Sequence, residues 1–131
     1  MTEELLRQLE ELIGTDEFEY RSEEIMEQLE DEGAGIEITE SLLSIMERHP
    51  LDDYGMPGAM THFIERFYPD FLPSLIASVK RRPTAHTVWM LQRCINAVSD
   101  KEELIAVLRD VADDSSVEQI IRDEANSFLK R

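Results

Sequence analysis

Residues 72–98, LPSLIASVKRRPTAHTVWMLQRCINAV, decide the fold class of this chain. Apolar side chains recur there every three to four residues, which is the spacing of the apolar stripe on an α-helix. These positions are Leu72, Leu75, Ile76 and Val79, and, after a polar turn, Val88 and Leu91. A similar pattern returns 30–32 residues later, at Leu104, Val107, Leu108, Val111, Ile120 and Ile121. A helix-turn-helix unit repeated at this period is typical of stacked helical hairpins, as in HEAT or armadillo arrays.

The helical period extends over the rest of the chain. We predict eight short helices, near residues 5–13, 22–32, 39–49, 58–67, 69–80, 84–98, 100–112 and 116–130. The second helix is expected to start near Ser22, and the expected caps of the later helices are Thr39, Ser99 or Asp100, and Ser115 or Ser116. The short connections favour antiparallel neighbours. Residues 1–131 are therefore predicted to be a single all-α domain, an irregular bundle with HEAT/armadillo-like hairpins in its C-terminal half.

The whole chain has a formal net charge of −16. Most of the negative charge is in its first half. Residues 1–66 hold 4 basic and 19 acidic side chains, a net of −15, whereas residues 67–131 hold 9 and 10, a net of −1. Such a distribution repels nucleic acid and anionic lipid and attracts basic partners. We therefore expect a protein partner of basic character, no nucleic acid and no membrane.

Other features narrow the class of protein. Cys94 is the only cysteine, which excludes an internal disulfide, and its apolar helical setting predicts a small buried side chain. The N-terminus lacks the features of a signal peptide, and no apolar run approaches the roughly 20 residues that span a bilayer. His62 and Glu65 share a helix face, but no further ligand matches their spacing, so we expect no metal and no cofactor. The expectation is a soluble, cytoplasmic protein without catalytic residues.

The predicted helix that begins near Ser22 is the first candidate for partner binding. Its acidic residues outside the apolar stripe are Glu23, Glu24, Glu27, Glu30 and Asp31, and Asp52 and Asp53 follow in the loop 50–58. Like charges four residues apart weaken an isolated helix, and ordinary soluble helices mix the two signs. Two interpretations stay open at this point: a solvated face, or a docking surface for a cationic partner.

The predicted helix 84–98 is the second candidate. His86, Trp89, Arg93 and Asn96 form a stripe beside its apolar stripe, and Trp and Arg are enriched at binding hot spots. His86, Trp89 and Arg93 are accordingly predicted to contact the partner. In the alternative interpretation Trp89 belongs to the core and Arg93 pairs with an acid from the helix 58–67 or the loop before it.

A third of the chain, residues 53–96, resembles bacterial immunity proteins of contact-dependent growth inhibition and related polymorphic toxin systems. The similarity is carried by Asp53-Tyr54-Gly55-Met56-Pro57-Gly58, His62-Phe63-Ile64-Glu65, Tyr68, Leu72, Ser78, Arg82-Pro83-Thr84, Met90-Leu91, Arg93 and Asn96. The resemblance implies a small all-α cytoplasmic protein that binds one cognate toxin domain and blocks its active site. It carries over no catalytic residue.

The charge distribution agrees with that implication, because nuclease toxins need a basic substrate groove that an acidic inhibitor can cover. The sequence therefore predicts an immunity protein for a basic, nuclease-type toxin. A helical-repeat adaptor for a basic cellular protein is the alternative.

Overall fold

The computed structural model describes residues 2–55 and 57–130 and contains, within them, eight α-helices and no strand. The helices are α1 (Thr2–Leu12), α2 (Phe18–Asp31), α3 (Ile38–Arg48), α4 (Ala59–Glu65), α5 (Leu72–Arg81), α6 (Ala85–Ile95), α7 (Glu102–Asp113) and α8 (Gln119–Leu129). The predicted all-α fold is confirmed. None of the described helices is both long and apolar enough to cross a membrane.

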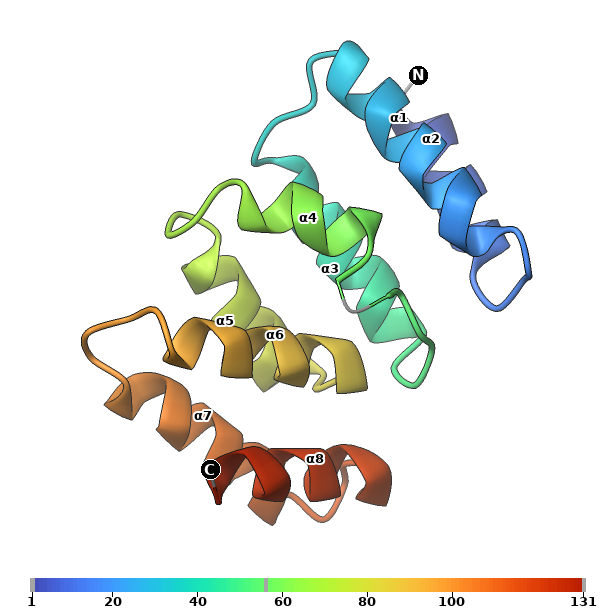
Figure 1. Cartoon of the computed structure of the whole chain (residues 1–131). Helices are drawn as coiled ribbons and strands as arrows, with labels where there is room; N and C mark the ends of the chain where they lie inside the picture. Colours follow the sequence, from blue (N-terminus) through green and yellow to red (C-terminus); the bar gives the residue numbers. More distant parts are fainter. Residues whose placement is uncertain (1, 56, 131) are drawn as a thin grey trace.

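The helices follow one another as four pairs, from α1 and α2 at one end of the molecule to α7 and α8 at the other (Figure 1). The first helices of the pairs begin at residues 2, 38, 72 and 102, at intervals of 36, 34 and 30 residues. Each pair packs on the next: α1 contacts α3, α2 contacts α4, α3 contacts α5, and α6 contacts α8. An irregular bundle built from successive pairs describes this arrangement, while the HEAT or armadillo likeness stays a prediction.

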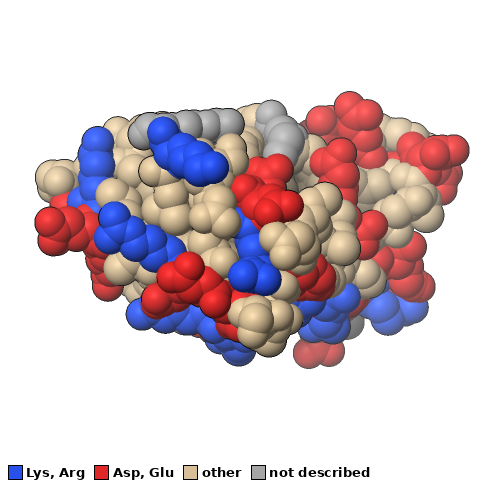
Figure 2. Space-filling model, turned by 90° about the horizontal axis from the view of Figure 1, so that it is seen from below, with Lys and Arg blue, Asp and Glu red and all other residues tan. Residues whose placement is uncertain are grey.

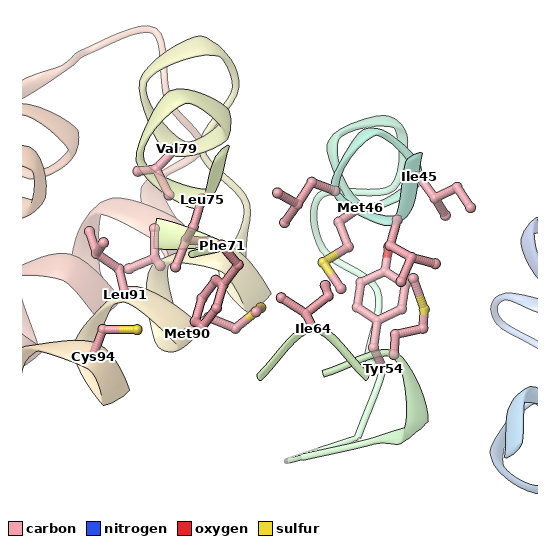
Figure 3. Close-up of a cluster of buried hydrophobic side chains, with 14 of the residues drawn as sticks. Ile45, Met46, Tyr54, Ile64, Phe71, Leu75, Val79, Met90, Leu91 and Cys94 are labelled. Atoms are coloured by element: carbon pink, nitrogen blue, oxygen red, sulfur yellow. The ribbon is translucent and has the colours of Figure 1, made fainter. Parts of the chain in front are cut away.

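One hydrophobic core connects the pairs, because each helix turns its apolar stripe toward its neighbours. In the middle of the molecule Ile64 of α4 lies between Met46 and Tyr54 on one side and Phe71 and Met90 on the other (Figure 3). All five side chains are almost completely buried. This packing holds α4, a helix of only seven residues, between α3 of its own pair and the pair that follows, α5 and α6.

The loop between α3 and α4 is built around Tyr54, which is only 1% exposed. Its hydroxyl donates to the carbonyl of His49 at 2.7 Å, and its ring meets those of Phe18 and His86 edge-on. At Gly58 an added Cβ would lie 1.8 Å from the carbonyl oxygen of Tyr54, so no larger residue fits there. This part of the segment 53–96 therefore builds the fold; Met56 lies outside the described residues.

Helices α2 and α3 begin earlier than predicted, because tertiary packing extends them toward the N-terminus. Helix α2 begins at Phe18, whose buried ring packs against Tyr54, and Ser22 lies inside the helix with its hydroxyl bonded to the Glu19 carbonyl. Helix α3 begins at Ile38 rather than with Thr39 as its cap, and Thr39 is buried.

The later helices are shorter than predicted because polar side chains stabilise the turns around them. Thr84 caps α6 by accepting a hydrogen bond from the Thr87 amide, and α6 ends at Ile95. Asp114 accepts hydrogen bonds from the amide and hydroxyl of Ser116, which holds this segment in a turn and delays α8 to residue 119. Asp100 bonds the Glu102 amide from just outside α7.

Within the described residues, five arginine–glutamate pairs join different helix pairs to one another. They are Arg48–Glu10, Arg66–Glu30, Arg81–Glu47, Arg93–Glu65 and Arg82–Glu118. Their partners lie 28 to 38 residues apart, which matches the spacing of the pairs along the chain. Pairs this close to solvent each contribute roughly 1 kcal/mol or less. Their main effect is to fix how each helix pair sits on the next.

Candidate functional site

Helix α2 presents its acidic side chains to solvent, as its sequence pattern predicts. Ile25, Met26 and Leu29 are buried, whereas Glu23, Glu24, Glu27, Glu30 and Asp31 are all exposed. The helical period places the carboxylates opposite the apolar stripe. The exposed acids of α2 fall into two groups, because only some of them face α4.

The acids that face α4 line the sides of two adjoining hollows. The first, with a volume of about 340 Å³, is lined by Glu19, Glu23 and Asp53 and by the backbone around Gly55 and Gly58. Asp53 is held there because its carboxylate accepts a hydrogen bond from the Gly55 amide at 2.8 Å. The structure thus brings together two predicted contact residues from separate segments, Glu23 and Asp53, and adds Glu19, which precedes the helix start predicted near Ser22.

The second hollow lies between α2 and α4 and has a volume of about 330 Å³. Glu23, Glu27 and Glu30 line it from α2, together with Met26. From the other side it is lined by Ala59, His62, Phe63 and Arg66. Glu23 and Ala59 line both hollows, so the two lie next to each other. We call this combined feature the α2–α4 groove.

One cation already lies in the α2–α4 groove. Arg66, just after α4, forms an ion pair with Glu30, and its guanidinium lies 5.7 Å and 5.9 Å from the ring centres of Phe63 and Phe67. A carboxylate and an aromatic face together make a favourable site for a guanidinium group. The sequence pattern does not single out Arg66, because its partner is 36 residues away.

The other acids of α2 have little compensation. Arg21 lies 3.4 Å from Glu24, and the two form an ion pair within the helix. Within the residues that the structure describes, Glu23, Glu27 and Asp31 form no ion pair. The negative potential over α2 is therefore left largely unbalanced.

Asp52 does not join this group. Its carboxylate lies 3.7 Å from His49 Nδ1, and His49 Nε2 is 2.8 Å from Glu10 on α1. Glu10 also accepts two hydrogen bonds from Arg48, both at 2.8 Å. The hydrogen bonds from Arg48 lower the pKa of Glu10, and the bond to His49 lowers it further. Partial burial acts in the opposite direction but is outweighed, so the pKa of Glu10 falls to about 2. This cluster joins α1 to α3.

The prediction that His86 contacts a partner is corrected, because His86 is only 4% exposed. Its Nε2 lies 2.6 Å from the hydroxyl of Thr61, and its ring packs between those of Tyr54 and Trp89. Burial lowers the pKa of His86 to about 4. A buried, neutral imidazole of this kind holds α6 against α4.

Arg93 and Trp89 lie next to one another on α6. Arg93 is exposed but donates two hydrogen bonds to Glu65 of α4, and its guanidinium lies 4.9 Å from the centre of the partly buried Trp89 ring. The alternative in which Arg93 pairs with an acid of the predicted helix 58–67 is confirmed. A hollow of about 380 Å³ adjoins this pair and is lined also by Tyr68, Phe71 and Asn96.

Cys94, which also lines that hollow, is buried and free, as its sequence setting predicts. Burial raises the pKa of its thiol to about 11. A thiol with so high a pKa is a poor nucleophile at neutral pH.

No protein-family model, curated protein or solved structure matches this chain. The resemblance of residues 53–96 to immunity proteins therefore stays a prediction.

Figure 2 shows that on one face of the molecule acidic side chains gather toward the side occupied by α1 and α2, and that the two signs are mixed over the C-terminal helices. The uneven charge of the sequence thus also appears on the folded surface. Within residues 2–55 and 57–130, no three His, Cys, Asp or Glu side chains are arranged to hold a metal ion. The acidic side of the molecule is thus an anionic surface that contains the α2–α4 groove.

Proposed function

We propose that this chain is an immunity protein that binds a cognate, basic toxin domain in the cytoplasm and neutralises it by covering its active site. The proposal depends on one observation above all. Glu23 and Glu27 are exposed along the α2–α4 groove and have no ion-pair partner among the described residues. A surface of this kind is suited to a partner that supplies the missing cations.

The physical basis is electrostatic complementarity. Carboxylates on one side of the inhibitor meet the Lys and Arg side chains with which a nuclease holds phosphates. Complementary fields accelerate association toward 10⁸–10⁹ M⁻¹s⁻¹ at low salt, against about 10⁵–10⁶ without steering. Fast capture is useful to an inhibitor that must reach its target before the target reaches its substrate.

The immunity-protein-like motif supports the proposal through the scaffold. Tyr54 and Gly58 of that motif determine the path of the loop into α4, and this loop forms one end of the α2–α4 groove. The motif thus positions the groove, while α2, which lies outside the motif, provides most of the acidic side chains.

A helical-repeat adaptor for a basic cellular protein is the second candidate. The regular succession of helix pairs, at intervals of 36, 34 and 30 residues, favours it, because such arrays form extended binding surfaces. The two candidates differ in consequence: an immunity protein abolishes the activity of its partner, and an adaptor leaves that activity intact.

The test uses the C-terminal domain of the protein encoded by the gene directly upstream. We expect that domain to co-purify with this chain and to lose its toxic activity when bound. Replacing Glu23, Glu24 and Glu27 with Lys should slow association at least tenfold at low salt and flatten its salt dependence.

A matched variant changes the same number of charges at the other end of the molecule. Asp110, Asp113 and Glu124 are exposed on α7 and α8, and their replacement with Lys should slow association much less. Equal slowing by both triple variants would remove α2 from the interface. Binding without inhibition would favour the adaptor, and no binding of the unmodified chain would overturn the immunity proposal.

A further inference from the structure

We propose that the α2–α4 groove binds a segment of the partner that presents two Arg or Lys side chains one helical turn apart. This inference rests on the proposed function only in taking the partner to be basic. It adds where on the acidic side the partner docks and which pattern of side chains the groove selects.

The shape of the groove is the first argument. Met26, Ala59 and Phe63 give it an apolar lining that extends between the two helices. Glu23, Glu27 and Glu30 follow one another at intervals of four and three residues, so their carboxylates lie along one line on α2. Lys and Arg side chains have apolar stems and charged ends, which suits an apolar lining with an acidic edge.

Arg66 shows how a guanidinium fits this groove. It binds the last carboxylate of the line, Glu30, while stacking near Phe63 and Phe67. Glu27 and Glu23 continue the same line toward the N-terminus of α2 and line the groove without an ion pair among the described residues. An incoming Arg or Lys placed beside each of them would extend the row that Arg66 begins.

The spacing of the unpaired acids defines the pattern in the partner. Glu23 and Glu27 are four residues apart on a helix, so their Cβ atoms are about 5–6 Å apart and their charges repel. Two cations at the same spacing satisfy both carboxylates and remove that repulsion. A partner helix with basic residues at i and i+4 has this spacing.

The hollow between α4 and α6 is a weaker candidate for the same role. The charged side chains that line it, Glu65 and Arg93, already bond to each other at 2.8 and 2.9 Å. Its charges are thus mutually satisfied and select neither a basic nor an acidic partner.

The test uses a synthetic probe, an alanine-based helical peptide with two Arg residues four apart. Titrated into the isotope-labelled chain at low salt, the peptide should shift the backbone amide signals of Ala59, Phe63, Glu23 and Glu27. The same peptide with two Gln residues should leave them unchanged. The variant Glu23→Gln/Glu27→Gln should bind the Arg peptide about fivefold more weakly.

The matched variant is Glu24→Gln/Asp31→Asn, which removes the same charge from the part of α2 that does not line the groove. We expect it to bind within about twofold of the unmodified chain. Shifts spread over all of the acidic surface, equal weakening by the two variants, or no binding would each overturn the groove assignment. The toxin-domain experiment is independent, so charge-dependent capture there would leave the proposed function standing even if the groove assignment fails.

Discussion

Arg93 and Glu65 join α6 to α4 through two parallel hydrogen bonds, from Nε to Oε2 at 2.8 Å and from Nη2 to Oε1 at 2.9 Å. The guanidinium also lies over the Trp89 ring. A planar group held by a carboxylate and an aromatic face has little freedom left, so Arg93 is part of the scaffold as well as of the surface.

The first prediction concerns the strength of this pair. In a double-mutant cycle with Glu65→Gln and Arg93→Met, measured by urea unfolding, we expect a coupling energy of about 1 kcal/mol that decreases at high salt. The exposed pair Arg7–Glu11 within α1 is the matched control. It should give only about 0.3 kcal/mol. Equal coupling in the two pairs would show that the link between α4 and α6 stabilises the fold no more than an ordinary exposed pair.

The second prediction follows from the pKa of Glu10, which is lowered to about 2 from an ordinary value of 4.5. A lowered carboxyl pKa stabilises the fold above pH 4.5, and this contribution disappears as the pH falls from 4.5 to about 2. Because the side chain is 27% exposed, we expect Glu10→Gln to lose about 1–2 kcal/mol at pH 7. Urea unfolding at several pH values should show that difference shrink toward zero near pH 2. A difference that is independent of pH would contradict the role of the Glu10 charge.

The third prediction concerns the close approach of Gly58 to Tyr54. Gly58→Ala would place a methyl group 1.8 Å from a backbone oxygen, so the loop must move, and we expect a loss of at least about 3 kcal/mol. Gly33→Ala is the control, because Gly33 has a φ of +87° but open space around it. It should cost only about 1 kcal/mol. Thermal unfolding of the two variants compares the costs directly, and similar values would contradict the steric argument.

The fourth prediction is that His86 stays neutral across the physiological pH range. Burial lowers its pKa to about 4, so its ring signals in an NMR titration should not move until the pH falls well below 6. The unfolded chain takes up this proton first, near pH 6.5, so stability is lost progressively between pH 6.5 and about 4. His86→Gln should reduce this loss in urea unfolding. A midpoint near 6.5 for His86 would show that the imidazole is open to solvent.

The number and order of the helices could be predicted from the sequence, since the apolar period is a local property. Leu75 and Val79, or Leu104 and Leu108, appear one turn apart in the chain and remain on one face in the structure. The acidic character of α2 is equally local, because Glu23 and Glu27 lie outside its apolar stripe. Helix ends were less predictable: the buried ring of Phe18, which contacts Tyr54, extends α2 beyond the cap expected at Ser22.

The candidate site could be predicted only in part. The sequence by itself determined that the N-terminal helices are acidic, because charge is a sum over residues and survives any arrangement of the helices. Only the tertiary structure decided that Glu23 and Asp53 share a hollow, that Arg66 neutralises Glu30, and that His86 is buried. The physical reason is that ion pairing and burial depend on which helices pack together, and these partners lie 25 to 36 residues apart along the chain.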